Sequence, residues 1–185
     1  MGCIGAWEYL GEAEKGLMIV YTGPGKGKTT AALGLALRVI GHGGSVCLVQ
    51  FMKGRATGEV RAAGLLPGFT VIQAGREGFV DVNDPAPGDR LRAAQGWEEA
   101  AEALRCGEFR LVILDEVNVA AACGLVDPQE VLAAVEEGRA AGVDVVLTGR
   151  DAPEEFIARA DLVTVMEEVK HPYRRGAAAR AGIEY

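Results

Sequence analysis

A glycine-rich stretch at residues 21 to 30, YTGPGKGKTT, contains the residues best suited to bind a phosphate chain. Glycines let the backbone turn tightly with its N–H groups aimed inward, and a helix that begins there adds the positive end of its dipole. Lys28 is placed to contact phosphates as a point charge, and the Thr29 hydroxyl is placed to ligate magnesium. Thr22 stands where the GxxxxGK[ST] pattern has its first glycine, and Gly23 follows one residue late. An apolar run before the loop and helical spacing after it still predict a nucleotide-binding P-loop.

Two carboxylates end a second apolar run, LVILDE at residues 111 to 116. In folds with a P-loop, such a strand brings either Asp115 or Glu116 beside the magnesium ion. A third group, Arg150, follows the run VDVVLTG, and its guanidinium suits either phosphate recognition or a structural contact. The sequence therefore predicts a phosphate and metal site made from three separated segments.

Short apolar runs alternate with longer segments of helical spacing along the chain. Runs rich in valine, isoleucine and leucine predict strands buried on both faces, at residues 17 to 22, 45 to 51, 69 to 73, 111 to 116, 143 to 149 and 161 to 166. Helical periodicity predicts helices at residues 28 to 41, 89 to 106, 128 to 141 and 153 to 159. This alternation predicts an α/β fold, with a mostly parallel sheet and helices on both faces.

The segment from residue 75 to 90, GREGFVDVNDPAPGDR, is the one long stretch without periodicity. Loops of this length in compact domains are often functional, so we expect it to contact a ligand. Asp127 and Pro128 predict the start of the third helix, with the aspartate as its cap. No linker divides the chain, so we expect one domain over residues 16 to 185 and a separate N-terminal segment over residues 1 to 15.

Composition narrows the range of partners. The chain of 185 residues has 19 lysines and arginines against 26 aspartates and glutamates, a net charge of -7, and no basic run. This balance argues against nucleic-acid binding. The four cysteines form no zinc-binding spacing, and no apolar run is long enough to span a membrane. The N-terminus also lacks the pattern of a signal peptide, so we expect a cytoplasmic protein.

Several motifs, in this order and at similar spacing, resemble those of the P-loop type of ATP:cob(I)alamin (corrinoid) adenosyltransferase. They are TGPGKGKTTAALGLALRVIGHG, VQFMKG, VILDEVN, LTGRDAP, ADLVTVMEEVKHPY and the final GAAARAGIEY, and they cover residues 16 to 185. The shifted first glycine is itself a trait of that family. The resemblance implies a P-loop NTPase-like, RecA-type three-layer fold and a homodimer.

The resemblance also implies a reaction, in which the 5′-deoxyadenosyl group of ATP passes to the cobalt of a reduced cob(I) corrinoid and triphosphate is released. The enzyme would transfer an alkyl group, with Mg²⁺ or Mn²⁺ as cofactor. Its partners would be ATP, cobalamin or a cobalamin precursor, and an electron donor such as a flavodoxin or flavin reductase. The loop would then hold triphosphate as a leaving group, where its amides and lysines stabilise developing charge.

Site residues follow from the same resemblance. Lys28, Thr29 and Glu116 match the family's catalytic positions; Thr29 and Glu116 match its metal contacts, with Asp115 in support. Phe79 matches an aromatic residue that covers the corrin. The expected ATP contacts are Thr22, Gly23, Pro24, Gly25, Lys26, Gly27, Lys28, Thr29, Thr30 and Arg150.

One position departs from the family pattern, because Asp81 replaces its second aromatic residue over the corrin. In the family these aromatic rings help to displace the lower axial ligand of cobalt, and an aspartate cannot pack as a hydrophobic wedge. Two other functions therefore stay open from the sequence. One is an ATP-dependent corrinoid carrier or sensor without turnover, and the other is a generic P-loop ATPase.

Overall fold

A six-stranded parallel sheet forms the centre of the computed structural model, which describes residues 15 to 76, 78 and 80 to 184. Every strand pair is parallel. Across the sheet the order is β3 (Phe69–Ala74), β2 (Val46–Phe51), β4 (Leu111–Asp115), β5 (Asp144–Thr148), β1 (Met18–Thr22) and β6 (Leu162–Val165). All six strands lie where the apolar runs predicted them, with ends that differ by at most one residue.

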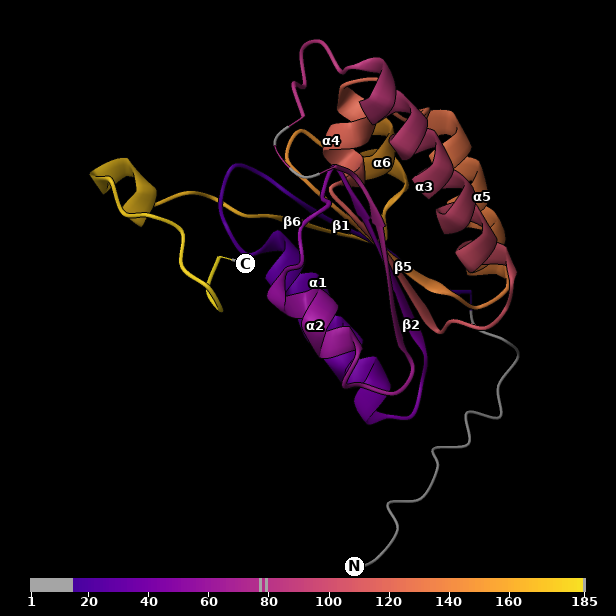
Figure 1. Ribbon diagram of the computed structural model, residues 1–185. Coiled ribbons are helices and arrows are strands. Elements are labelled where there is room, and N and C mark those ends of the chain that lie inside the picture. Colours follow the sequence, from indigo (N-terminus) through magenta and orange to yellow (C-terminus); the bar gives the residue numbers. More distant parts are fainter. Residues whose placement is uncertain (1–14, 77, 79, 185) are drawn as a thin grey trace, which may run out of the picture.

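Helices cover both faces of the sheet, which confirms the three-layer prediction (Figure 1). One face carries α1 (Lys28–Gly41) and α2 (Gly58–Ala63), and the opposite face carries α3 (Pro87–Arg105), α4 (Val117–Ala122), α5 (Pro128–Ala140) and α6 (Glu154–Arg159). A 3-10 turn, η1 (Pro172–Arg175), follows the last strand. The sequence did not predict α2 and α4, two helices of six residues each, although it did predict α6, which has the same length.

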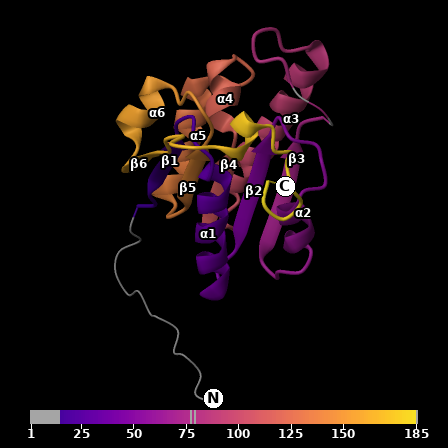
Figure 2. The same ribbon diagram turned by 90° about the vertical axis from the view of Figure 1, so that its left-hand side faces the viewer.

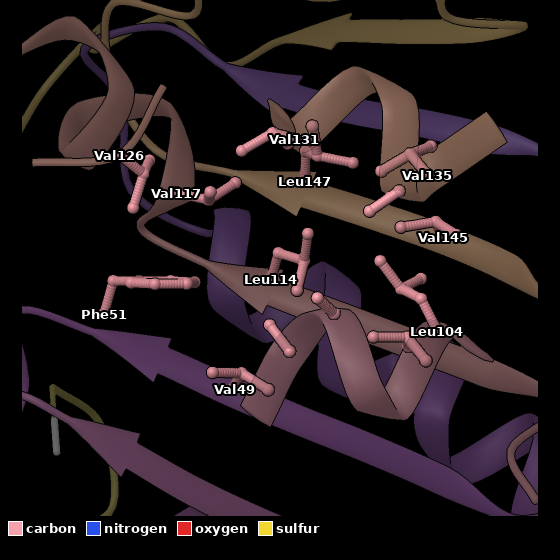
Figure 3. Packing of buried hydrophobic residues seen from close by; sticks show 14 of the residues in the cluster. Val49, Phe51, Leu104, Leu114, Val117, Val126, Val131, Val135, Val145 and Leu147 are labelled. Atoms are coloured by element: carbon pink, nitrogen blue, oxygen red, sulfur yellow. The ribbon is translucent and has the colours of Figure 1, made fainter. Parts of the chain in front are cut away.

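The larger hydrophobic core lies between the sheet and helices α3 to α6 (Figure 3). Val49, Leu114 and Leu147 enter it from three neighbouring strands, and Leu104 and Val135 enter it from α3 and α5. A smaller cluster packs α1 against the other face through Ala32 and Ala36. Both faces of β2, β4 and β5 are therefore buried, and the strand ends are held in fixed positions.

Strand β6 differs from the prediction that all strands are buried. Leu162, Val163 and Val165 are 45%, 37% and 54% exposed. The reason is its place at the edge of the sheet, where β1 is its one neighbouring strand. Apolar content alone does not distinguish an edge strand from a central one.

The long loop before α3 is shorter than predicted, because α3 begins at Pro87. Its two ends are joined by an ion pair in which Arg76 Nε lies 2.7 Å from Asp89 Oδ1. Asp89 is buried and also accepts a hydrogen bond from the Ala86 amide. The predicted cap of α5 is confirmed, since Asp127 Oδ1 accepts a hydrogen bond from Gln129 N at 2.8 Å. Within the described part of the chain, no helix is long and apolar enough to cross a membrane.

Candidate functional site

The P-loop connects the end of β1 to the start of α1, as the sequence predicted. Its turn needs glycine at two points, because Gly23 and Gly27 have φ angles of 95° and 117°. Gly25 leaves no room for a side chain, since a Cβ there would lie 2.6 Å from Met166 O. The Gly25 amide donates to the same carbonyl oxygen at 2.6 Å. The loop therefore rests on the segment that follows β6.

Lys28 is buried at the first position of α1. Its Nζ donates to Gly23 O at 2.8 Å and to Gly25 O at 2.6 Å, so the ammonium group lies inside the curve of the loop. Burial lowers the pKa of Lys28, while the nearby carboxylate of Glu116 acts in the opposite direction. This position suits a point charge that contacts a phosphate chain.

Asp115 is fully buried at the end of β4 and accepts hydrogen bonds on both oxygens. Thr29 Oγ1 and Thr148 Oγ1 donate to Oδ1 at 2.8 and 2.7 Å. Lys53 Nζ and Gln50 Nε2 donate to Oδ2 at 2.6 and 3.1 Å. Burial alone would raise the pKa of Asp115, but the Lys53 ammonium and these hydrogen bonds outweigh it and hold the pKa below its usual value. Asp115 is therefore an ionised carboxylate whose oxygens are already engaged.

Glu116 is adjacent in sequence but has a different environment. Its backbone is left-handed, with φ of 63°, and its amide donates to Thr148 Oγ1 at 3.1 Å. Its carboxylate lines the cleft described below and accepts no hydrogen bond from any residue that the structure describes. Burial and the charge of Asp115 raise the pKa of Glu116. Of the two carboxylates, Glu116 is the one with free oxygens.

A cleft of about 1200 Å³ opens beside the P-loop. Its lining includes the hydroxyl groups of Thr29 and Thr30 and the charged side chains of Lys26, Lys28, Lys53, Glu59, Glu116, Arg150, Glu168, Arg180 and Glu184. Its apolar lining comes from α1 and the α2 region through Leu33, Leu37, Ile40, Ala62, Leu66 and Phe69. The C-terminal segment after β6 forms the remaining wall, on the α1 side of the sheet, as it passes toward α2 (Figure 2).

Most of the predicted ATP contacts meet at this cleft. Pro24, Gly25, Gly27, Thr30 and Arg150 line it. Lys26 also lines it, and its Nζ donates to Ile183 O at 3.0 Å and to Glu184 Oε1 at 2.9 Å.

Two of the expected contacts, Thr22 and Gly23, are not part of the cleft lining. Thr22 is buried, and its Oγ1 accepts a hydrogen bond from Ala152 N at 3.3 Å. The residue at the unusual position of the motif thus joins the P-loop to the loop after β5.

The corrin-covering residues are not brought to this cleft by the described part of the structure. Phe79 lies outside the described residues, as do residues 1 to 14, where the N-terminal segment was predicted. Asp81 is exposed, and its Oδ1 accepts a hydrogen bond from Asn83 N at 3.0 Å. None of the described residues between 75 and 90 lines the cleft.

Sequence reasoning missed four polar residues around the carboxylates: Gln50, Lys53, Asn118 and Thr148. Asn118 Nδ2 donates to Tyr21 O and Gly149 O, which joins β1 to the loop after β5. A signal for Lys53 and Gln50 was present. Gln50 interrupts an apolar run, and Lys53 follows it at the carboxyl end of a strand that pairs in parallel with β4.

A cation-binding cluster of three or more His, Cys, Asp or Glu residues does not occur among the described residues. Glu116 and the Thr29 hydroxyl therefore form the most suitable pair of oxygen ligands beside the loop. A hard cation such as Mg²⁺ is commonly held by one or two protein oxygens together with substrate phosphates, so this small set fits such an ion.

Comparison with known proteins extends the likeness over almost the whole chain. Residues 14–185 match the family model described as ATP:corrinoid adenosyltransferase BtuR/CobO/CobP. A corrinoid adenosyltransferase from Sinorhizobium sp is 42% identical over 93% of this chain and 81% of its own length. One from Pseudomonas aeruginosa is 38% identical over 93% and 85%, and one from Escherichia coli is 36% identical over 93% and 87%.

A solved structure, the flagellar accessory protein FlaH from Methanocaldococcus jannaschii, superposes with a TM-score of 0.55. It is 15% identical and covers 84% of this chain and 72% of its own, so it supports the P-loop NTPase-like fold alone. The family match and the identities to the three adenosyltransferases show more than the fold, because they identify the family of the chain. The chain belongs to the ATP:corrinoid adenosyltransferase family.

Proposed function

We propose that this protein transfers the 5′-deoxyadenosyl group of ATP to the cobalt of a cob(I) corrinoid and releases triphosphate. The family of the chain supports the reaction. The observation that carries it in the structure is the buried Lys28 ammonium, which lies inside the P-loop at the edge of a cleft that also contains Thr29 and Glu116. Ligand pockets usually have volumes of about 300–1,000 Å³, so a cleft of about 1200 Å³ has room for a nucleotide and part of a second substrate.

The reaction is a displacement at carbon. The cobalt of cob(I) donates an electron pair to C5′ of the ribose, a cobalt–carbon bond forms, and the C5′–oxygen bond breaks with its electrons passing to triphosphate. No proton moves in this step, so no general base is required. The task of the protein is to stabilise the negative charge that develops on the leaving group, and we propose this role for Lys28 and Lys26.

We propose that Glu116 and Thr29 hold Mg²⁺ or Mn²⁺ when the nucleotide is bound, with Asp115 in support. The Thr29 hydroxyl donates its hydrogen to Asp115 and accepts a long hydrogen bond from Lys53 Nζ at 3.5 Å, which leaves one lone pair available to a cation. The ion would neutralise charge on the phosphate chain. The roles of the other ATP contacts, from Thr22 to Thr30 and Arg150, belong to this proposal.

The corrinoid half of the site is proposed from the family resemblance. Phe79 would pack on the corrin ring, and the substrate would be cobalamin or a cobalamin precursor. A flavodoxin or a flavin reductase would supply the electron that converts cob(II) to cob(I). We further propose that the protein acts as a homodimer in the cytoplasm.

The test is to combine the protein anaerobically with ATP, Mg²⁺, cobalamin and a strong chemical reductant. We expect a light-sensitive alkyl-cobalt absorption spectrum and one free triphosphate for each corrinoid converted. Lys28→Ala should abolish most of the turnover, because it removes a desolvated charge from the phosphate site. Lys170→Ala, which changes an exposed lysine outside the cleft lining, is the matched control.

Two results would contradict the proposal. Release of ADP and phosphate at a rate that corrinoid does not change would indicate a generic P-loop ATPase. Tight binding of ATP and cobalamin with no alkyl-cobalt product would indicate a carrier or sensor.

A further inference from the structure

Lys53 is a third lysine at the P-loop, and no role follows for it from the P-loop motif. Its Nζ lies 2.6 Å from Asp115 Oδ2 and 3.5 Å from Thr29 Oγ1, and its side chain lines the cleft. Its side chain is 29% exposed, compared with complete burial for the Asp115 side chain. Lys53 therefore contacts a buried carboxylate at the end of β4 and is also accessible from the cleft.

The backbone around Lys53 holds it in one place. Met52, directly before it, has a left-handed φ of 60°, which turns the chain sharply at the end of β2. Gly75 packs against this turn so closely that a Cβ there would lie 2.3 Å from Lys53 N. Gly54 in turn packs against Arg76, where a Cβ would lie 2.5 Å from the carbonyl carbon. A non-glycine residue with positive φ is uncommon and often marks a functional constraint.

Charges of both signs lie near the metal-binding residues. The ammonium groups of Lys28 and Lys53 face the carboxylates of Asp115 and Glu116, and the charges of Glu59, Arg150 and Asp151 also act on this group. Four donors occupy the oxygens of Asp115, whereas Glu116 accepts no hydrogen bond from the described residues. Without Lys53, Asp115 Oδ2 would keep Gln50 as its one donor, and the site would have one more net negative charge.

We propose that Lys53 is a positioning residue that holds Asp115 away from the metal ion and offsets negative charge at the site. Glu116 then remains the carboxylate ligand, and Asp115 is confined to orienting the Thr29 hydroxyl. With part of its negative charge offset, the site binds a free divalent cation weakly, and it binds the cation more tightly when the anionic triphosphate is also present. The inference rests on the proposed function only in that ATP and a divalent cation bind at this loop.

A purely structural role for Lys53 makes a different prediction. If Lys53 only compensated the buried charge of Asp115, its loss would loosen the site and weaken every ligand. If it sets the charge of the site, its loss should strengthen the binding of a free cation and weaken the binding of ATP. The two affinities should therefore move in opposite directions.

The experiment compares Lys53→Met with Lys53→Arg, and Lys170→Met serves as the surface control. Binding of Mn²⁺ without nucleotide is measured from the electron paramagnetic resonance signal of the free ion, and binding of ATP with Mg²⁺ is measured by titration calorimetry. For Lys53→Met we expect about tenfold tighter Mn²⁺ binding and about tenfold weaker ATP binding, as the loss of one nearby positive charge implies. Lys53→Arg keeps the charge and should stay within about threefold of the wild type in both.

Weakening of both ligands, or no change in either, would overturn the inference. The double variant Lys53→Met, Asp115→Asn removes the charge pair together, and circular dichroism checks that both variants fold. In the double variant Mn²⁺ binding should return to the weak value of the wild type; continued tight binding would also contradict the inference. If Lys53→Met does not fold, the Mn²⁺ affinity of the double variant is compared with that of the wild type, and a tighter affinity in the double variant contradicts the inference. Corrinoid is absent throughout, so failed adenosylation by a wild-type protein that binds ATP would contradict the proposed function alone.

Discussion

Two adjacent carboxylates at the end of β4 differ in their hydrogen bonds and in the direction of their pKa shifts. This difference suits them to different roles. Asp115 is buried among four donors, with its pKa held below the usual value. Glu116 faces the cleft, and its pKa is raised by burial and by the charge of Asp115. A raised pKa means that the folded protein is destabilised when Glu116 is ionised. The residue best placed to bind a cation is therefore one that costs the fold stability, as is common at functional sites.

Glu116→Gln should consequently stabilise the protein without ligands near neutral pH. The folded state binds the Glu116 proton more tightly than the unfolded chain does, so wild-type stability falls as pH rises above about 4.3, the usual pKa of glutamate. Removal of the charge removes this loss. We expect a higher Tm than the wild type at pH 7, no difference below pH 4, and loss of most adenosylation. A lower Tm at pH 7 would show that Glu116 makes a net stabilising contribution.

Asp81 is the second residue whose replacement is informative, because its carboxylate is exposed and contacts the Asn83 amide within its own loop. Asp81→Trp restores an aromatic residue at a position where the family resemblance implies one. We expect faster reduction of cob(II) and faster adenosylation, with unchanged ATP affinity. Asp84→Trp, in the same exposed loop, is the control. Equal rates for Asp81→Trp and the wild type would show that the aspartate does not limit reduction.

At the scale of elements, close packing of α3 on the sheet fixes the core behind the site. Gly96 is the contact point, since a Cβ there would lie 2.0 Å from Ala74 Cβ on β3. Gly96→Ala should therefore destabilise the protein by about 1–3 kcal/mol, the usual cost of overpacking, even though alanine favours helices. Gly88→Ala is the matched control on the same helix, because a Cβ there would point into open space. Chemical denaturation measures both, and a stabilised Gly96→Ala would mean that the helix can shift away from β3.

The sequence predicted those elements whose pattern is local. Six apolar runs located six strands, and the P-loop and the carboxylates of β4 followed from motif and context. It did not predict the exposure of β6, because a strand's place in the sheet depends on pairing between distant segments. For the same reason it did not predict that Lys53 reaches Asp115, which lies 62 residues away along the chain.

At the scale of the whole molecule, the C-terminal segment completes the cleft beside the P-loop. Ile183 and Glu184 contact Lys26 of the P-loop, and Met166 contacts Gly25. None of the residues from 177 to 184 is buried, so their removal should leave the fold intact. A protein that ends at Gly176 should keep its circular dichroism spectrum and its Tm within a few degrees.

The same truncation should weaken ATP binding by about tenfold, because one wall of the cleft and the contacts that position Lys26 are lost. Titration calorimetry measures this effect. Glu184→Gln in the full chain separates the two contributions, since it removes the carboxylate charge that pairs with Lys26 and Arg180 and keeps the wall. An unchanged affinity in the truncated protein would show that the C-terminal segment has no part in nucleotide binding.

Strand order also has a consequence for synthesis on the ribosome. The P-loop follows β1, which lies between β5 and β6, and Met18 pairs with Val145 across 127 residues of chain. The P-loop is thus made early. The strand that precedes it, β1, has no strand to pair with until about four fifths of the polypeptide has left the ribosome. Contacts this distant in sequence form slowly. A nascent chain should therefore be unable to retain ATP until translation has passed β5, and until then both edges of the apolar strand β1 stay unpaired and open to aggregation.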